Sequence, residues 1–147
     1  MDSAGFAVDA WGNRIRYAVS STAPNCASAP TTPHFTNAAN LRANGLTCQP
    51  NDLVVCQSAT GITSTTCGSA TPVTNQTTLV ALILAPGKNG SLGTGGADEA
   101  ANTNADRVFV WHTPTPSTAT NGEFDDQITW ITVGELYGKL VAASVLP

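Results

Sequence analysis

The chain has little charge and little aromatic surface. Charged residues make up 11% of its 147 residues and aromatic residues 6%. It holds six Lys and Arg against ten Asp and Glu, and the six basic residues are spread along the sequence. A protein that neutralises a run of phosphates needs clustered basic residues, often with aromatic residues among them. We therefore expect no nucleic-acid partner.

Long hydrophobic runs are also missing. The longest one, residues 79–85, is followed by Pro86 and is far shorter than the roughly 20 apolar residues that span a bilayer. Ala, Thr, Ser, Asn and Gly dominate instead, which is typical of a loop-rich polar domain outside the cell. We therefore expect an extracytoplasmic protein. We also expect one domain over residues 1–147, because no break in composition divides the chain.

The four cysteines are Cys26, Cys48, Cys56 and Cys67, and none forms a Cys-x-x-Cys pair of the kind that binds zinc. An even number of cysteines in a polar, extracytoplasmic chain favours two disulfides, for which three connectivities are possible. We favour Cys26 with Cys48 and Cys56 with Cys67, because each pair closes a short loop. Loops of this size are stabilised by roughly 3 kcal/mol in the chain-entropy model.

Five segments have the length and composition of strands: residues 13–20, 52–57, 79–85, 107–112 and 128–131. In the first, Ile15, Tyr17 and Val19 alternate with other residues, which predicts that these three face the core. The unbroken apolar segment 79–85 predicts a central strand covered on both faces.

The last part of the chain predicts a helix. Thr132 and Glu135 have the spacing of a capping box. Apolar residues follow at helical spacing, which predicts a face that packs on the sheet: Val133, Leu136, Tyr137, Leu140 and Val141. With long loops over residues 22–76 and 86–105, the expected fold class is α+β, an antiparallel sheet with a short C-terminal helix.

Acidic residues gather in one part of the chain. Six of the ten lie between residues 98 and 126, where Arg107 is the only basic residue. Hard cations such as Ca²⁺ take carboxylates, Asn side chains and loop carbonyls as ligands. The helix-loop-helix calcium pattern is absent, so a site would be assembled from separate loops. The candidate ligands are Asn89, Asp98, Asp106, Asp125 and Asp126; a solvated acidic loop is the alternative.

No catalytic set stands out. Asp125 and Asp126 are adjacent, and if the strand at 128 extends back to them they point to opposite faces rather than at one substrate. His34 and His112 are the only histidines, and no Gly-x-Ser-x-Gly elbow accompanies them. The glycine-rich residues 86–96 miss the spacing of nucleotide-binding loops. We expect no enzyme; a small hydrolase that uses Asp125 or His112 is the weakest alternative.

Three stretches, in this order, resemble the globular domain of type IV pilin-like proteins, either minor pilins or type II secretion pseudopilins. "DAWGNRIRY" (9–17) is similar to the Asp-Pro-Trp-Gly-Asn-x-Tyr segment before the first strand, with Ala10 in place of Pro. "PGKNGSLGTGGADE" (86–99) is similar to the glycine-rich loop of pseudopilins. "GEFDDQITWI" (122–131) is similar to the Asp-rich segment that helps bind calcium in the major pseudopilin.

The resemblance implies a non-enzymatic filament subunit that acts by assembly and surface display. It implies partners that are other pilin or pseudopilin subunits, contacted through a hydrophobic N-terminal helix ahead of this sequence and through the domain surface. Before assembly that helix would anchor the protein in the inner membrane, facing the periplasm. The alternative is a secreted or surface binding module, an adhesin, that uses its Thr/Asn-rich loops with Trp11 or Trp111 as anchors, although we expect both Trp side chains to be buried.

Overall fold

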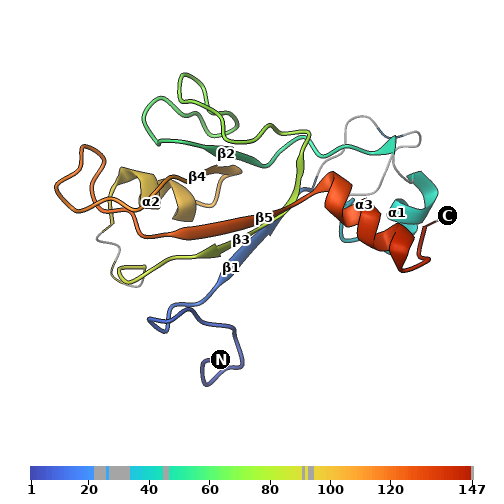
Figure 1. Ribbon diagram of the computed structural model, residues 1–147, viewed down its shortest axis with the longest axis horizontal. Coiled ribbons are helices and arrows are strands. Elements are labelled where there is room, and N and C mark those ends of the chain that lie inside the picture. Colours follow the sequence, from blue (N-terminus) through green and yellow to red (C-terminus); the bar gives the residue numbers. More distant parts are fainter. Residues whose placement is uncertain (22–25, 27–33, 45–46, 91, 93–94, 147) are drawn as a thin grey trace.

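The computed structural model describes residues 1–21, 26, 34–44, 47–90, 92 and 95–146. The chain is an α+β fold, as expected (Figure 1). Its elements follow in this order: β1 (Arg16–Val19), α1 (Ala38–Asn44), β2 (Val54–Cys56), β3 (Leu79–Ala85), α2 (Ala97–Thr103), β4 (Val108–Val110), β5 (Gln127–Thr132) and α3 (Val133–Ala142). Among the described residues, no helix is long and apolar enough to cross a membrane.

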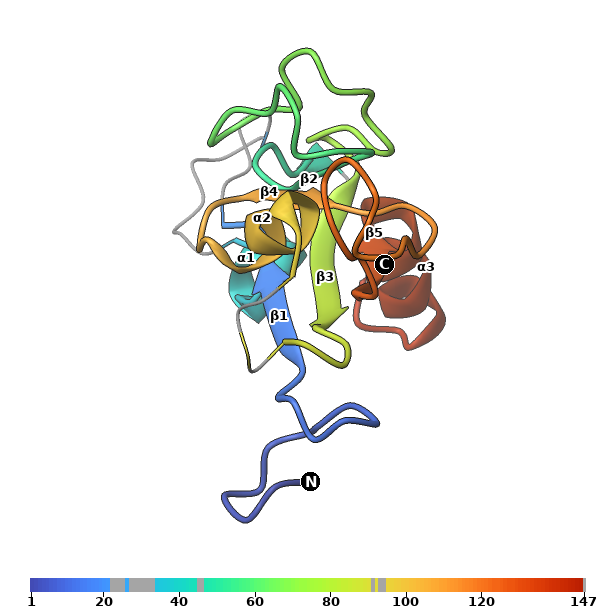
Figure 2. The same ribbon diagram turned by 90° about the vertical axis from the view of Figure 1, so that its left-hand side faces the viewer.

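The strands form two separate sheets. β1, β3 and β5 make an antiparallel sheet with β3 in the centre, which confirms the position predicted for residues 79–85. β2 and β4 pair in parallel, with Val54 opposite Val108. Together with α2, this pair lies across one face of the larger sheet (Figures 1 and 2). The parallel pair was not predicted, because a strand pattern does not reveal the direction of its partner.

The two faces of the larger sheet differ. On the covered face, Leu82 and Leu84 pack with Leu53, Val55 and Phe109 from the β2–β4 side.

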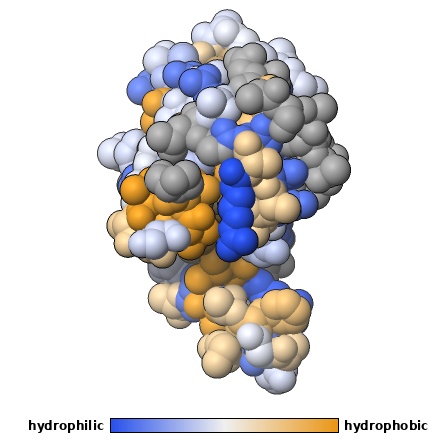
Figure 3. All heavy atoms as spheres, turned by 90° about the vertical axis from the view of Figure 1, so that its right-hand side faces the viewer, coloured by the Kyte–Doolittle hydropathy of each residue, from blue (hydrophilic) through white to orange (hydrophobic). Residues whose placement is uncertain are grey.

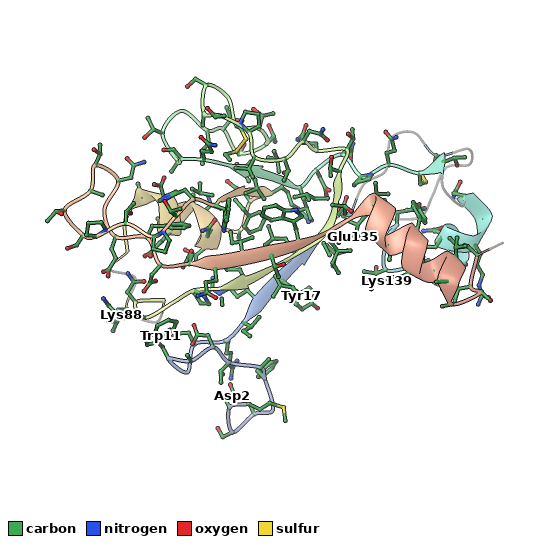
Figure 4. All side chains as sticks on the ribbon, in the orientation of Figure 1. Asp2, Trp11, Tyr17, Lys88, Glu135 and Lys139 are labelled. Atoms are coloured by element: carbon green, nitrogen blue, oxygen red, sulfur yellow. A yellow bond between two sulfur atoms is a disulfide. The ribbon has the colours of Figure 1, made fainter. Side chains whose placement is uncertain are left out.

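The opposite face is open: Tyr17 is 79%, Ile83 40% and Ile131 39% exposed. Tyr17 extends from β1 on the side away from the β2–β4 layer (Figure 4). The prediction that Ile15 and Tyr17 face the core, and that β3 is covered on both faces, was therefore wrong. Side chains alternate along a strand, so once Leu82 and Leu84 face the second layer, Ile83 and its cross-strand partner Tyr17 face outward.

The C-terminal helix is confirmed, with its capping box. Glu135 N–H donates to Thr132 Oγ1 at 3.2 Å, and Thr132 N–H donates to Glu135 Oε2 at 2.8 Å. Its buried residue, Tyr137, packs in one cluster with Val80 of the sheet, Phe35 before α1 and Leu41 of α1.

The helix therefore packs against the end of the sheet rather than across its face. Helix α1, which belongs to the region predicted as loop, contributes Leu41 to this cluster, and Cys48 and Leu146 are also buried in it. The surface at this end carries an apolar patch beside a hydrophilic stripe (Figure 3).

Both predicted disulfides are present. Cys26 bonds to Cys48 with Cα atoms 4.4 Å apart, and Cys56 bonds to Cys67 with Cα atoms 5.6 Å apart. Cys48 and Cys56 are fully buried, each in a different apolar cluster. The two crosslinks therefore anchor the long loop-rich region to the core at two places. Residues 22–25, 27–33 and 45–46 of that region lie outside the described residues.

Residues 1–14 project away from the sheet (Figures 1 and 2). The segment is closed on itself, since Val8 bridges to Arg14 and Arg14 Nε lies 2.7 Å from Asp2 Oδ2. Trp11 is 53% and Trp111 39% exposed, so neither is buried as expected. Trp111 does keep an edge contact with Trp130, with ring centroids 6.0 Å apart.

A pair of neighbouring substitutions tests the two faces of β3. Ile83→Thr keeps a β-branched side chain on the open face and should lower the free energy of unfolding by less than about 1 kcal/mol. Leu82→Thr, at a residue only 1% exposed, leaves a cavity and a buried hydroxyl and should cost roughly 3 kcal/mol. Urea unfolding of both variants with disulfides intact measures the difference. Equal losses would contradict the assignment of the faces.

Candidate functional site

Three carboxylates converge at the end of the sheet where β3 ends and β5 begins. Glu99 comes from α2, and Asp125 and Asp126 immediately precede β5. One oxygen of each lies within 4.8 Å of the others. β5 starts only at Gln127, so the two aspartates lie outside the strand and do not follow its alternation. They converge on Glu99 and do not point to opposite faces, as they would if the strand extended back to them.

Hydrogen bonds hold one oxygen of each carboxylate. Asp125 N–H donates to Glu99 Oε1 at 2.7 Å, and Lys88 N–H donates to Asp125 Oδ2 at 3.1 Å. Asn102 Nδ2 donates to Asp126 Oδ2 at 2.8 Å. The other oxygen of Asp125, Oδ1, is buried and has no hydrogen-bond partner in the described chain.

The glycine-rich loop after β3 supplies the room for these groups. A Cβ on Gly87 would lie 1.9 Å from Asp125 Oδ1, and a Cβ on Gly95 would lie 1.6 Å from Glu99 Oε2. Gly87 also has a φ of +67°, a backbone angle that residues with a Cβ rarely adopt. At these two positions the absence of a side chain lets the backbone approach the carboxylates directly.

Asn89 completes the cluster. It is 4% exposed and lines a cavity of about 110 Å³ together with Glu99 and Asp126. Its side chain interacts with the carboxylates of Glu99 and Glu123 and acts to lower the pKa of each, although its buried Nδ2 makes no hydrogen bond of good geometry with a described residue. A buried polar side chain therefore faces the same space as the carboxylates. Its amide offers an oxygen ligand when it turns over.

Basic neighbours offset only part of the cluster's negative charge: Lys88 attracts Asp125 and Glu99, and Arg16 acts to lower the pKa of Asp126. Burial, with the charges of Asp126 and Asp125 nearby, raises the pKa of Glu99 to about 7. Burial also raises the pKa of Asp126 to about 6, although the hydrogen bond from Asn102 acts against it. The nearest lysine, Lys88, forms its ion pair with Glu123 instead, at 2.7 Å; it marks this end of the molecule in Figure 4.

Of the five predicted ligands, the structure brings three together: Asn89, Asp125 and Asp126. Asp98 lies in a different network. It accepts from Ala59 N–H at 2.5 Å and lies 3.1 Å from His112 Nε2.

Asp106 caps the turn after α2, where it accepts from Val108 N–H at 2.8 Å. The missed residue is Glu99. Consecutive residues on a helix point about 100° apart, so recognising α2 in the sequence would have separated Asp98 from Glu99.

The arrangement fits a hard divalent cation. Ca²⁺ takes six to eight oxygen ligands from carboxylates, amide oxygens, backbone carbonyls and water. Glu99, Asp125 and Asp126 offer carboxylate oxygens, and Asn89 offers an amide, from three separate segments. Binding would relieve the repulsion among the carboxylates and tie those segments together.

Comparison of this chain with family models, with curated proteins and with solved structures found no match in any of the three.

The raised pKa values predict how stability depends on pH when metal is removed. The pKa values of about 7 for Glu99 and 6 for Asp126 lie above their ordinary values of 4.5 and 3.8. At pH values between the ordinary and the raised pKa values, the folded chain therefore binds more protons than the unfolded chain. As pH rises through this range, these groups lower the free energy of unfolding.

Urea unfolding in a chelator at pH 5 and pH 8 measures the effect, with Glu99→Gln as the control. His34 acts in the opposite direction, because burial lowers its pKa from 6.5, so the comparison with the variant isolates Glu99. Wild type should lose more stability between the two pH values than Glu99→Gln. Identical pH dependence would show that Glu99 does not have a raised pKa.

Proposed function

We propose that this domain is a structural subunit of a bacterial type IV pilus or type II secretion filament, acting by assembly and display and not by catalysis. The observation that carries the proposal is the meeting of the three stretches that resemble the family. Asn13 of the first donates to Gly87 O of the second. Lys88 and Glu99 of the second bind Asp125 of the third. Stretches far apart in sequence thus form one structural unit.

The open face of the sheet supports the same proposal. Tyr17, Ile83 and Ile131 present apolar surface from three adjacent strands. The resemblance implies contacts with neighbouring subunits through the domain surface as well as through a hydrophobic helix, and an exposed apolar face suits such a contact. The two disulfides agree with an extracytoplasmic location, because disulfides persist in oxidising compartments.

Calcium is the cation that we assign to the carboxylate cluster. Its flexible coordination suits ligands that come from separate loops, whereas Mg²⁺ demands a nearly ideal octahedron. Bound there, it would fasten the glycine-rich loop to α2 and to the start of β5. Its role in a filament subunit would be to stiffen this end of the domain.

Two adjacent residues of α2 allow a matched test of the calcium site. Excess Ca²⁺ at about a hundred times its dissociation constant adds roughly 2.7 kcal/mol to a folded state that alone binds it. For a chain of this size that raises the melting temperature by about 5–10 °C over the value in chelator. Glu99→Gln should abolish most of this shift, whereas Asp98→Asn should retain it. Loss of the shift in both variants, or none in wild type, would contradict the assignment.

Filament incorporation is the direct test of the proposed function. The site for an inserted epitope is the exposed turn at Ser117 and Thr118. When the full-length protein is produced in its host, we expect immunogold label on filaments sheared from the cells. Label found only on freely released protein, with bare filaments, would contradict the proposal and favour a secreted binding module.

A further inference from the structure

The peptide group between Gly87 and Lys88 touches two parts of the molecule at once. Its carbonyl oxygen, on Gly87, accepts a hydrogen bond from Asn13 Nδ2. Its N–H, on Lys88, donates to Asp125 Oδ2 at 3.1 Å. The peptide group is planar and rigid, so a rotation that weakens one of these bonds also displaces the other. A single backbone unit therefore links the turn before β1 to the carboxylate cluster.

Gly87 makes this orientation of the peptide group accessible. Its φ of +67° and its contact with Asp125, where a Cβ would lie 1.9 Å from Oδ1, both exclude a larger residue without movement. The orientation of the peptide group is therefore fixed by the contact of Gly87 with Asp125 on one side and by the hydrogen bond from Asn13 on the other. Removing the Asn13 amide leaves Gly87 O, among the described residues, with the long bond from Gly90 N–H at 3.5 Å.

Asn13 itself is held in place by a built turn. Asp9 Oδ1 accepts from Trp11 N–H and from Asn13 N–H, both at 2.9 Å, and Asp9 N–H donates back to Asn13 O at 2.9 Å. Asn13 is 9% exposed, although the segment to which it belongs projects from the domain. The direction of that segment is thus linked to the loop through this side chain.

We propose that Asn13 is a positioning residue of the cation site, and that a bound cation in turn fixes the turn at residues 9–13 and so the direction in which the N-terminal segment leaves the domain. The inference rests on the proposed cation site. Coupling between two equilibria is reciprocal: if the Asn13 bond raises cation affinity by some factor, the cation favours the bonded turn by the same factor. In a filament subunit this would connect calcium to the geometry of the segment that precedes the sheet.

Calcium titration calorimetry of the 147-residue chain tests the first half. A net hydrogen-bond contribution predicts that Asn13→Ala and Asn13→Leu bind Ca²⁺ about two- to tenfold more weakly than wild type. Asn13→Leu keeps a side chain that branches at Cγ and removes the whole amide, donor and acceptor together. Asn44→Ala is the control: Asn44 is 5% exposed and donates to Asn40 O in α1, away from the cluster, and its loss should leave calcium affinity unchanged.

Amide hydrogen exchange tests the second half. The N–H groups of Asp9 and Gly12 are both bonded within the turn, at 2.9 and 3.2 Å. Calcium should slow their exchange in wild type and in Asn44→Ala, and should have no such effect in Asn13→Ala. A purely structural role for Asn13 would raise exchange in the variant and leave the response to calcium intact.

The possible failures are distinguishable. If wild type binds Ca²⁺ but the Asn13 variants bind equally well, or if their turns still respond to calcium, the coupling is wrong and the cation site stands. If wild type itself binds no Ca²⁺, the cation site fails and this inference fails with it.

Discussion

The register of the three-stranded sheet is the constraint on which the rest of the structure depends. β1 pairs with β3 so that Arg16 faces Leu84, and β5 pairs with β3 so that Gln127 faces Ala85. Just beyond the strand ends, Asn13 donates to Gly87 O and Asp125 contacts Gly87, so both lie beside the loop that follows β3. A shift of either pairing by one residue would also turn its apolar side chains to the wrong face, so burial of Leu82 and Leu84 helps to fix the site.

The carboxylate cluster is a place where the fold works against its own stability. Burying ionised groups without partners is unfavourable, and the raised pKa values of Glu99 and Asp126 report that cost. The structure nevertheless brings the glycine-rich loop close around them, with the buried Asn89 beside them and an oxygen of Asp125 that has no hydrogen-bond partner among the described residues. Perturbed groups of this kind concentrate at functional sites, which agrees with a cluster that is completed by a cation.

Local patterns predicted much of this fold, because their causes are local. The strands around residues 16–19, 54–56, 79–85, 108–110 and 127–132 were all expected, as were the capping box at Thr132 and both cysteine pairs. Helix α2 was missed because its stability is tertiary. It has only seven residues, too few to be stable alone, and Asn102 holds it to β4 by bonds to Val110 N–H and Val110 O.

The sequence also did not predict which face of a strand would be buried. Nothing in the alternation of residues 13–20 says which side a second layer will cover, and the β2–β4 pair settled that question from outside the strand. The error over Asp98 and Glu99 had the same origin, since assigning them to a loop left their directions undefined. The clustering of acidic residues located the candidate site to within a few residues. Whether Asp98 or Glu99 belongs to it depends on α2, which the sequence analysis missed.

The central claim is that Glu99, Asp125 and Asp126 bind one cation. A crystal structure of this chain grown with Ca²⁺ tests it most directly. The account predicts a single strong density peak about 2.3–2.6 Å from oxygens of these three carboxylates, with Asn89 turned toward it. A calcium ion bound instead at Asp98 and Asp106, or well-ordered carboxylates with only water between them, would contradict it.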